Sequence, residues 1–273
     1  MITLSNLRFG YTPKRPIFDS LDMELSAGHI YGLLGRNGCG KSTLLKLITG
    51  MITPQQGAVT TLGVDPARRL PSLMRQIYYL PEYAQPLSTT MHSYTSMVAP
   101  LYDSFDHEAL EGYMSEFELE MDKRFDRMSL GERRKANIAF ALACKSRILV
   151  MDEPTNGLDI PSKSQFRKIV ARETTDDRMV IISTHQVRDL DNLIDSIIIL
   201  NQNHVALNAT VGHIAERLTF KQLTSDESAI YDETNSMTRW GGWSRIDRAR
   251  SRGSILSCYS MPLSRSLPRS QSC

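Results

Sequence analysis

The stretch IYGLL at residues 30–34, followed by GRNGCGKST at residues 35–43, decides the fold of this chain. The first part is a short apolar run, which is typical of a buried strand. The second part matches the pattern GxxxxGK[ST], and residues 42–49 continue it with helical spacing up to Gly50. A glycine-rich loop between a strand and a helix cradles phosphate, because backbone N–H groups and the helix N-terminus converge on the anion. The stretch therefore predicts a nucleotide-binding loop.

Each residue of this loop is a candidate for nucleotide binding. Lys41 is expected to reach the β- and γ-phosphates, and the Ser42 hydroxyl is expected to ligate Mg²⁺. The nine candidates are Gly35, Arg36, Asn37, Gly38, Cys39, Gly40, Lys41, Ser42 and Thr43.

A second motif places two carboxylates after another apolar run, ILVM at residues 148–151. Ligands of open α/β sheets bind at the C-terminal ends of the strands, where Asp152 and Glu153 stand. Asp152 is expected to hold Mg²⁺ through water, and Glu153 to act as the general base on the attacking water. Together with the loop, these residues predict ATP binding and hydrolysis.

The remaining pattern alternates strands with helices. Strands are predicted at 2–9, 76–80, 179–183 and 197–200, and helices at 130–144 and 162–174. Between the strand segments lies a mainly helical block, about 86–145. Within this block, Asp106 can cap a helix that has an apolar face; that face consists of Leu110, Tyr113, Met114 and Phe117. Such alternation predicts an α/β fold with a mostly parallel sheet covered on both faces.

Composition limits the function classes. Of the 273 residues, 41% are hydrophobic and 23% charged, as in soluble globular proteins, and the net charge of +2 gives no reason to expect nucleic acid as a partner. The four cysteines have no zinc-ligand spacing. The N-terminus lacks signal-peptide features, and no apolar run approaches the roughly 20 residues that cross a bilayer. The serine- and arginine-rich segment 244–273 is predicted to be disordered or the product of a frameshift or truncation.

A third motif, Met-Ser-Leu-Gly-Glu at residues 128–132, begins the helix of residues 130–144. Ser129 and Glu132 form an S-x-x-E capping box, and taken alone this is simply a well-capped helix. Its position in the order of motifs along the chain adds a functional interpretation. The motifs follow one another in the order phosphate loop, helical block, this motif, apolar-Asp-Glu, Pro-Thr-Asn-Gly-Leu-Asp and Ser-Thr-His. This order resembles that of the nucleotide-binding subunits of ATP-binding cassette (ABC) proteins, specifically the exporter-type branch. The resemblance covers about residues 1–217, with 218–273 as an extension.

The resemblance implies a P-loop NTPase fold with an N-terminal antiparallel β part and an inserted helical subdomain. It also implies roles for further residues. Tyr11 matches the aromatic residue that stacks on adenine, and His185 matches the histidine that senses the γ-phosphate. Asp159 matches the loop that communicates across a dimer. The signature motif, which contacts the ATP bound to the opposite subunit, falls on Ser129, Gly131 and Glu132, although Leu130 replaces a glycine of the usual LSGGQ.

Two positions of the pattern are unusual. Glu82 stands where the family usually has a glutamine that ligates Mg²⁺, and a carboxylate can ligate this ion more strongly than an amide. Gln85, three residues later, is the alternative ligand. Cys39 lies in the phosphate loop near Lys41 and a helix N-terminus, which predicts a thiol biased toward thiolate. Alternatively, cysteine is simply a small residue that fits there.

The resemblance further implies how such a subunit works. Two ATP molecules would join a head-to-tail homodimer or heterodimer, with Mg²⁺ as cofactor and integral membrane permease subunits as partners. The protein would then be cytoplasmic and peripheral on the inner face of the cell membrane. A docking surface for the permease is expected after Glu82, including Tyr83, Tyr94, Met97 and Tyr102. The alternative function is a soluble ABC ATPase that acts on ribosomes or DNA without transport.

Overall fold

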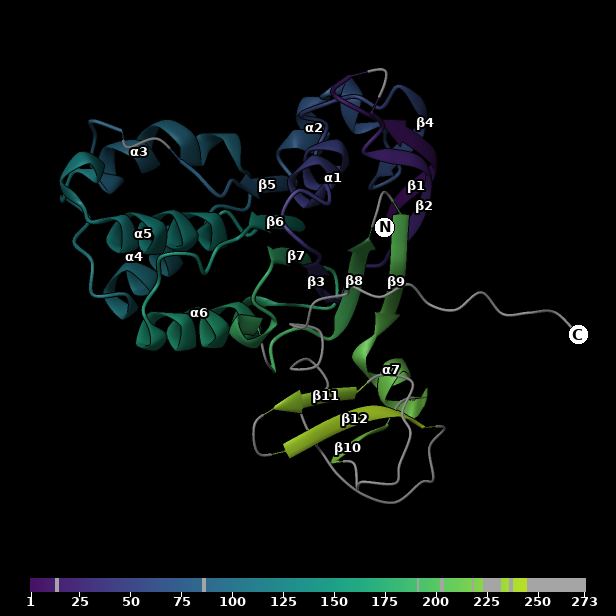
Figure 1. The fold of residues 1–273 in the computed structure, drawn as a ribbon. Helices are drawn as coiled ribbons and strands as arrows, with labels where there is room; N and C mark the ends of the chain where they lie inside the picture. The colour runs from purple at the N-terminus through teal and green to yellow at the C-terminus, as the bar shows by residue number, and fades with distance from the viewer. Residues whose placement is uncertain are drawn as a thin grey trace, which may run out of the picture.

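The computed structural model describes residues 1–12, 15–84, 87–190, 192–201, 204–217, 219–222, 232–235 and 238–244. Its centre is a six-stranded sheet with the order β5-β6-β7-β3-β8-β9 (Figure 1). All neighbouring strands pair in parallel except β8 and β9, which are antiparallel. The strands of this sheet are β3 (Ile30–Leu34), β5 (Ile77–Leu80), β6 (Ile148–Asp152), β7 (Met179–Thr184), β8 (Ser196–Asn201) and β9 (His204–Thr210). The predicted mostly parallel sheet is confirmed.

A smaller antiparallel sheet is built from the N-terminal part of the chain, with the order β2-β1-β4. Its strands are β1 (Ile2–Phe9), β2 (Phe18–Leu25) and β4 (Gln56–Thr61). The N-terminal antiparallel part is thus confirmed. A third sheet, with the order β10-β12-β11, contains β10 (Thr219–Gln222), β11 (Asp232–Asn235) and β12 (Thr238–Ser244).

Helices cover both faces of the central sheet. The helices α3, α4, α5 and α6 lie on one side, and α1 and α2 lie with the antiparallel sheet on the other side (Figure 1). The α-helices are α1 (Lys41–Ile48), α2 (Pro71–Met74), α3 (Met91–Val98), α4 (His107–Glu116), α5 (Leu130–Ala143), α6 (Ile160–Glu173) and α7 (Val211–Arg217). The described residues also form four 3₁₀ turns: η1 (Pro66–Arg68), η2 (Ala99–Leu101), η3 (Phe125–Arg127) and η4 (Val187–Leu190).

The core has two layers, one on each face of the sheet. Every residue of β6 is buried, and its side chains alternate between the two layers. Leu149 and Met151 pack in the layer with the helical block, whereas Ile148 and Val150 pack in the layer with α1. A strand covered on both faces explains why this segment is continuously apolar.

The helical block forms much as its sequence predicts. The Asp106 side chain accepts a hydrogen bond from the Ala109 N–H and so caps α4, and the four apolar positions of that helix face are all buried. Within the part of the chain that is described, no helix is both long and apolar enough to cross a membrane. Ser244 ends β12, and residues 245–273, on which the prediction of disorder falls, lie outside the described residues.

Candidate nucleotide-binding site

The phosphate loop connects β3 to α1, and its backbone requires glycine. Gly40 is the N-cap of α1 and has φ = 104°. A Cβ atom there would also lie 2.7 Å from Ile17 Cγ2, so a larger residue is excluded by both strain and space. No side chain caps this end of α1, so its first N–H groups are available to an anion.

A cavity of about 420 Å³ opens at this loop. It is lined by residues from separate parts of the sequence: Tyr11, Ile17, Asn37, Gly38, Gly40, Lys41, Ser42, Thr43, Glu82, Glu153 and His185. All of these except Ile17 are residues that the sequence singled out. Gly35, Arg36 and Cys39 are not among the lining residues, although the Gly35 carbonyl accepts a hydrogen bond from Lys41 Nζ at 2.9 Å.

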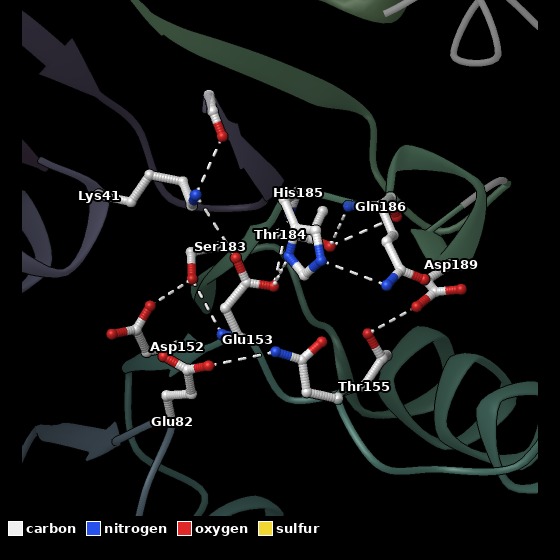
Figure 2. Close-up of polar contacts among 12 residues, drawn as sticks. Lys41, Glu82, Asp152, Glu153, Thr155, Ser183, Thr184, His185, Gln186 and Asp189 are labelled. Carbon is white, nitrogen blue, oxygen red and sulfur yellow. Dashed lines mark hydrogen bonds and ion pairs between the residues drawn. The ribbon is translucent and has the colours of Figure 1, made fainter. Parts of the chain in front are cut away.

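Glu153 connects the phosphate loop to the end of β7. Its Oε1 atom lies 3.4 Å from Lys41 Nζ, and its Oε2 atom accepts a hydrogen bond from His185 Nδ1 at 2.9 Å (Figure 2). On the other side of the imidazole, Nε2 lies 3.2 Å from the Gln186 amide nitrogen. A cation, a carboxylate and an imidazole thus meet at the cavity.

The backbone of Glu153 is strained and held on both sides. Its φ of 47° is a left-handed conformation, which is rare for a residue with a side chain and common at functional sites. The Glu153 N–H donates to the Ser183 hydroxyl at 2.9 Å. Its carbonyl accepts from Arg134 Nη2 at 2.9 Å, and Arg134 Nη1 donates to the Pro81 carbonyl at 3.0 Å. Burial lowers the pKa of this guanidinium, which still remains protonated at neutral pH.

Asp152 is buried next to Glu153. Its Oδ1 atom accepts a hydrogen bond from the Ser183 hydroxyl, and its Oδ2 atom accepts one from the Tyr79 hydroxyl at 3.3 Å. Among the described residues, no group of three or more His, Cys, Asp or Glu side chains could hold a metal ion. Mg²⁺ is commonly bound through one or two carboxylates together with substrate phosphates. The Ser42 hydroxyl and the Asp152 carboxylate are oxygen donors of the kind that such an ion takes.

Tyr11 and Glu82 also line the cavity. The Tyr11 ring packs edge-on against Phe9, with centroids 5.2 Å apart, and its hydroxyl is 3.5 Å from Thr43 Oγ1. Glu82 Oε1 accepts a hydrogen bond from the Asn156 amide at 3.3 Å (Figure 2). The alternative ligand Gln85 lies outside the described residues.

Residues 18–156 match the family model described as "ABC transporter". The chain belongs to this family. The lantibiotic transport ATP-binding protein SrtF of Streptococcus pyogenes is 29% identical over 76% of this chain and 90% of its own length. The cobalt import ATP-binding protein CbiO of Salmonella typhimurium is 30% identical over 78% of this chain and 82% of its own length.

Solved structures show the same ABC fold. A structure described as the ATP-binding subunit of an ABC transporter has a TM-score of 0.71 at 24% identity, and covers 78% of this chain and 91% of its own. CbiO1 of Clostridium perfringens, described as part of the complex cbiONQ, has a TM-score of 0.64 at 21% identity, with 78% and 90% covered. Because the curated relatives are ATP-binding proteins of transporters, the alternative of a soluble ABC ATPase without transport is not favoured.

The ABC signature segment begins α5 and lies outside the cavity lining. The Ser129 hydroxyl accepts from the Glu132 N–H at 3.2 Å, and Glu132 Oε2 accepts from the Ser129 N–H at 2.9 Å. This is the predicted capping box, and it leaves the hydroxyl proton of Ser129 free to donate. Leu130 is 64% exposed. Its side chain lies beside Gly157, where an added Cβ would be 3.5 Å from Leu130 Cδ2, and Gly131 also approaches this loop, with the Gly157 carbonyl 3.3 Å from its own added Cβ.

Asp159 accepts a hydrogen bond from the Ser162 N–H at 3.0 Å and caps α6. The Ser162 hydroxyl, together with this bond, holds the pKa of Asp159 below its ordinary value. The cap gives the residue a structural role within its own chain. The roles of Asp159, Ser129, Gly131 and Glu132 toward a second subunit stay predictions.

The expectation of a thiolate at Cys39 is wrong. The thiol is partly buried, and its sulfur lies where a side chain on Gly35 would otherwise fit, 2.5 Å from the added Cβ. Burial raises the pKa of Cys39 more than the nearby Lys41 lowers it. The alternative interpretation, a small residue that fits the loop, agrees with this packing.

Several residues at the site were not predicted. Arg134 lies in the polar run Glu-Arg-Arg-Lys, which has the composition of a solvated helix face, yet it is buried. Asp189 accepts from the Thr155 hydroxyl at 2.9 Å and pairs with Lys163 Nζ at 2.7 Å, which ties the loop before α6 to the segment after His185. These contacts depend on which segments adjoin in space, and no spacing in the sequence reports that.

Proposed function

We propose that this chain is an ATP-binding and ATP-hydrolysing subunit that powers substrate transport through separate membrane subunits. The observation that carries this proposal is the meeting of Lys41, Glu153 and His185 at the cavity beside the phosphate loop. A cation for phosphate, a base for water and a hydrogen-bonding imidazole are what hydrolysis of a phosphoanhydride needs. The transporter relatives support the link to transport.

The residues divide the chemistry between them. The loop N–H groups and Lys41 bind the β- and γ-phosphates, and Tyr11 stacks on the adenine. Glu153 accepts the proton of the attacking water, and the His185 imidazole lies at the γ-phosphate. Ser42, Asp152 and Glu82 would hold Mg²⁺, and the ion would supply charge neutralisation at the phosphates.

The site becomes complete in a head-to-tail pair of such subunits. The Ser129 hydroxyl and the N-terminus of α5 then contact the γ-phosphate bound to the other subunit, and Asp159 lies at the junction. Support comes from the position of this segment outside the cavity of its own chain and from the exposure of its Leu130 side chain. Burial of the phosphate between the two subunits holds the pair closed, and hydrolysis allows the subunits to separate.

The membrane subunit docks next to the helical block. A groove of about 160 Å³ shares Glu82 with the nucleotide cavity. Tyr83 is 82% exposed and Met97 is 62% exposed, so both remain in the proposed surface. Tyr94 and Tyr102 do not, because they pack against the core beside Phe140 and Tyr78, and burial raises the pKa of both phenols. Such docking places the protein on the cytoplasmic face of a membrane.

Two variants test the enzymatic part. Glu153→Gln keeps the shape of the side chain and is expected to bind ATP, while its turnover falls about 10²- to 10⁴-fold through loss of the base. Lys41→Ala is expected to lose ATP affinity itself. Both are measured by phosphate release and by binding of a fluorescent ATP analogue. Rapid turnover by Glu153→Gln would remove this residue as the base.

A further inference from the structure

The carboxylate of Asp152 is held from both neighbouring strands. β5 and β7 flank β6 in the sheet, and Asp152 is the last residue of β6. From β7, Ser183 donates to Oδ1, and from β5, Tyr79 donates to Oδ2 at 3.3 Å. Each oxygen of this 3%-exposed residue therefore has its own hydroxyl donor.

Tyr79 and its neighbour Tyr78 lie on opposite faces of the sheet, because side chains alternate along a strand. Tyr78 packs on the helical face, with its ring centroid 6.0 Å from that of Phe140. Tyr79 packs against the other core layer, which contains residues of α1, and Ile17 of the cavity lining packs against the same layer. Tyr79 is thus the tyrosine of β5 on the nucleotide side.

The phenol of Tyr79 donates a hydrogen bond to Oδ2 of the Asp152 carboxylate. A protonated phenol donates to the carboxylate and restricts its rotation. The remaining lone pairs of the two oxygens stay available for a metal-bound water.

We propose that Tyr79 is a positioning residue that orients the Asp152 carboxylate toward the metal ion bound with the nucleotide. This inference rests on the proposed function. Hydrogen-bond partners that orient metal-ligating groups typically affect metal affinity by about 10- to 100-fold. An O–H···O distance of 3.3 Å is long, so the effect expected from removing the hydroxyl is at the lower end, about tenfold.

The test compares Tyr79→Phe with Tyr78→Phe, which removes the same hydroxyl from the adjacent residue on the opposite face. Mn²⁺ affinity of the purified protein with a slowly hydrolysed ATP analogue is measured by electron paramagnetic resonance, without turnover. Tyr79→Phe is expected to weaken Mn²⁺ binding about tenfold. Tyr78→Phe is expected to leave it unchanged, and neither variant should alter nucleotide affinity in EDTA. Wild-type Mn²⁺ affinity in Tyr79→Phe would overturn the inference.

A double-mutant cycle separates positioning from a general loss of structure. If Tyr79 acts through Asp152, the effect of Tyr79→Phe disappears in an Asp152→Asn background, since coupled residues are not additive. An equal loss in both backgrounds would overturn the inference. If the wild-type protein binds nucleotide but no Mn²⁺ with it, the proposed metal site is contradicted as well. If the wild-type protein binds Mn²⁺ normally and Tyr79→Phe binds it equally well, only the role of Tyr79 is overturned.

Discussion

Replacing Arg134 by methionine is expected to impair both stability and catalysis. The guanidinium donates to the Glu153 carbonyl at 2.9 Å in a buried setting and to the Pro81 carbonyl at 3.0 Å in a partly buried one. A hydrogen bond from a charged group contributes about 1.5–3 kcal/mol. With the second bond counted at about half, the pair contributes about 3 kcal/mol. Relief of the buried charge offsets part of this, which leaves a net loss of about 2 kcal/mol.

A loss of that size lowers the melting temperature by about 4–8 °C in a domain of this size. The catalytic effect arises because Arg134 holds the carbonyl of Glu153, whose φ of 47° is strained. Without that bond the backbone is expected to relax and displace the base, so kcat falls about tenfold or more, equivalent to about 1.4 kcal/mol. ATP affinity is expected to stay nearly unchanged, because the phosphate loop is not touched.

Thermal unfolding and steady-state phosphate release measure the two effects, with Arg133→Met as the matched control. Arg133 is the preceding residue of the same helix and is partly exposed. An unchanged melting temperature and kcat in Arg134→Met would refute the reasoning. So would an equal loss in Arg133→Met, because the effect would then follow from helix charge and not from these two bonds.

Three further predictions concern single groups. Ser129→Ala should lower the free energy of unfolding by about 1 kcal/mol through loss of the α5 cap, as measured by urea titration. Hydrogen bonds from Lys123 and from the Ser129 N–H lower the pKa of Glu132. The ionised carboxylate therefore stabilises the folded state fully above the unfolded pKa, and this contribution is lost as pH falls through the lowered folded pKa. Glu132→Gln should accordingly flatten the acid side of the curve of unfolding free energy against pH. Alkylation of Cys39 should be slow at neutral pH, because burial raises its pKa, and bound ATP should slow it further, as mass spectrometry would report.

The parts of the fold with strong local signals could be predicted from the sequence. β3 and β6 are continuous apolar runs, and the sequence of α4 shows both its capping aspartate and the apolar spacing of its buried face. β2 and β4 were missed. β4 begins with three exposed residues, and Gly57 within it has φ = 79°, so its pattern is not that of a regular half-buried strand.

The candidate site likewise contains residues that local motifs predict and residues that only the fold brings together. Lys41 and Glu153 belong to motifs whose meaning is local, and both lie at the cavity. Tyr79 and Ser183 could not be predicted, because their contact with Asp152 depends on the strand order β5-β6-β7, which brings together segments far apart in the chain. The pKa of Cys39 was misjudged because charge is visible in a sequence while burial is not.

The most direct test of the shared site mixes two inactive variants. Glu153→Gln lacks the base, whereas Ser129→Asp keeps a good helix cap and places negative charge against the phosphate of the other subunit. Each variant alone is expected to hydrolyse almost no ATP. In mixed pairs, one site combines Glu153 of one chain with Ser129 of the other, so mixing should restore phosphate release. Wild-type activity of Ser129→Asp alone, at a specific rate independent of protein concentration, would contradict a site shared between two subunits.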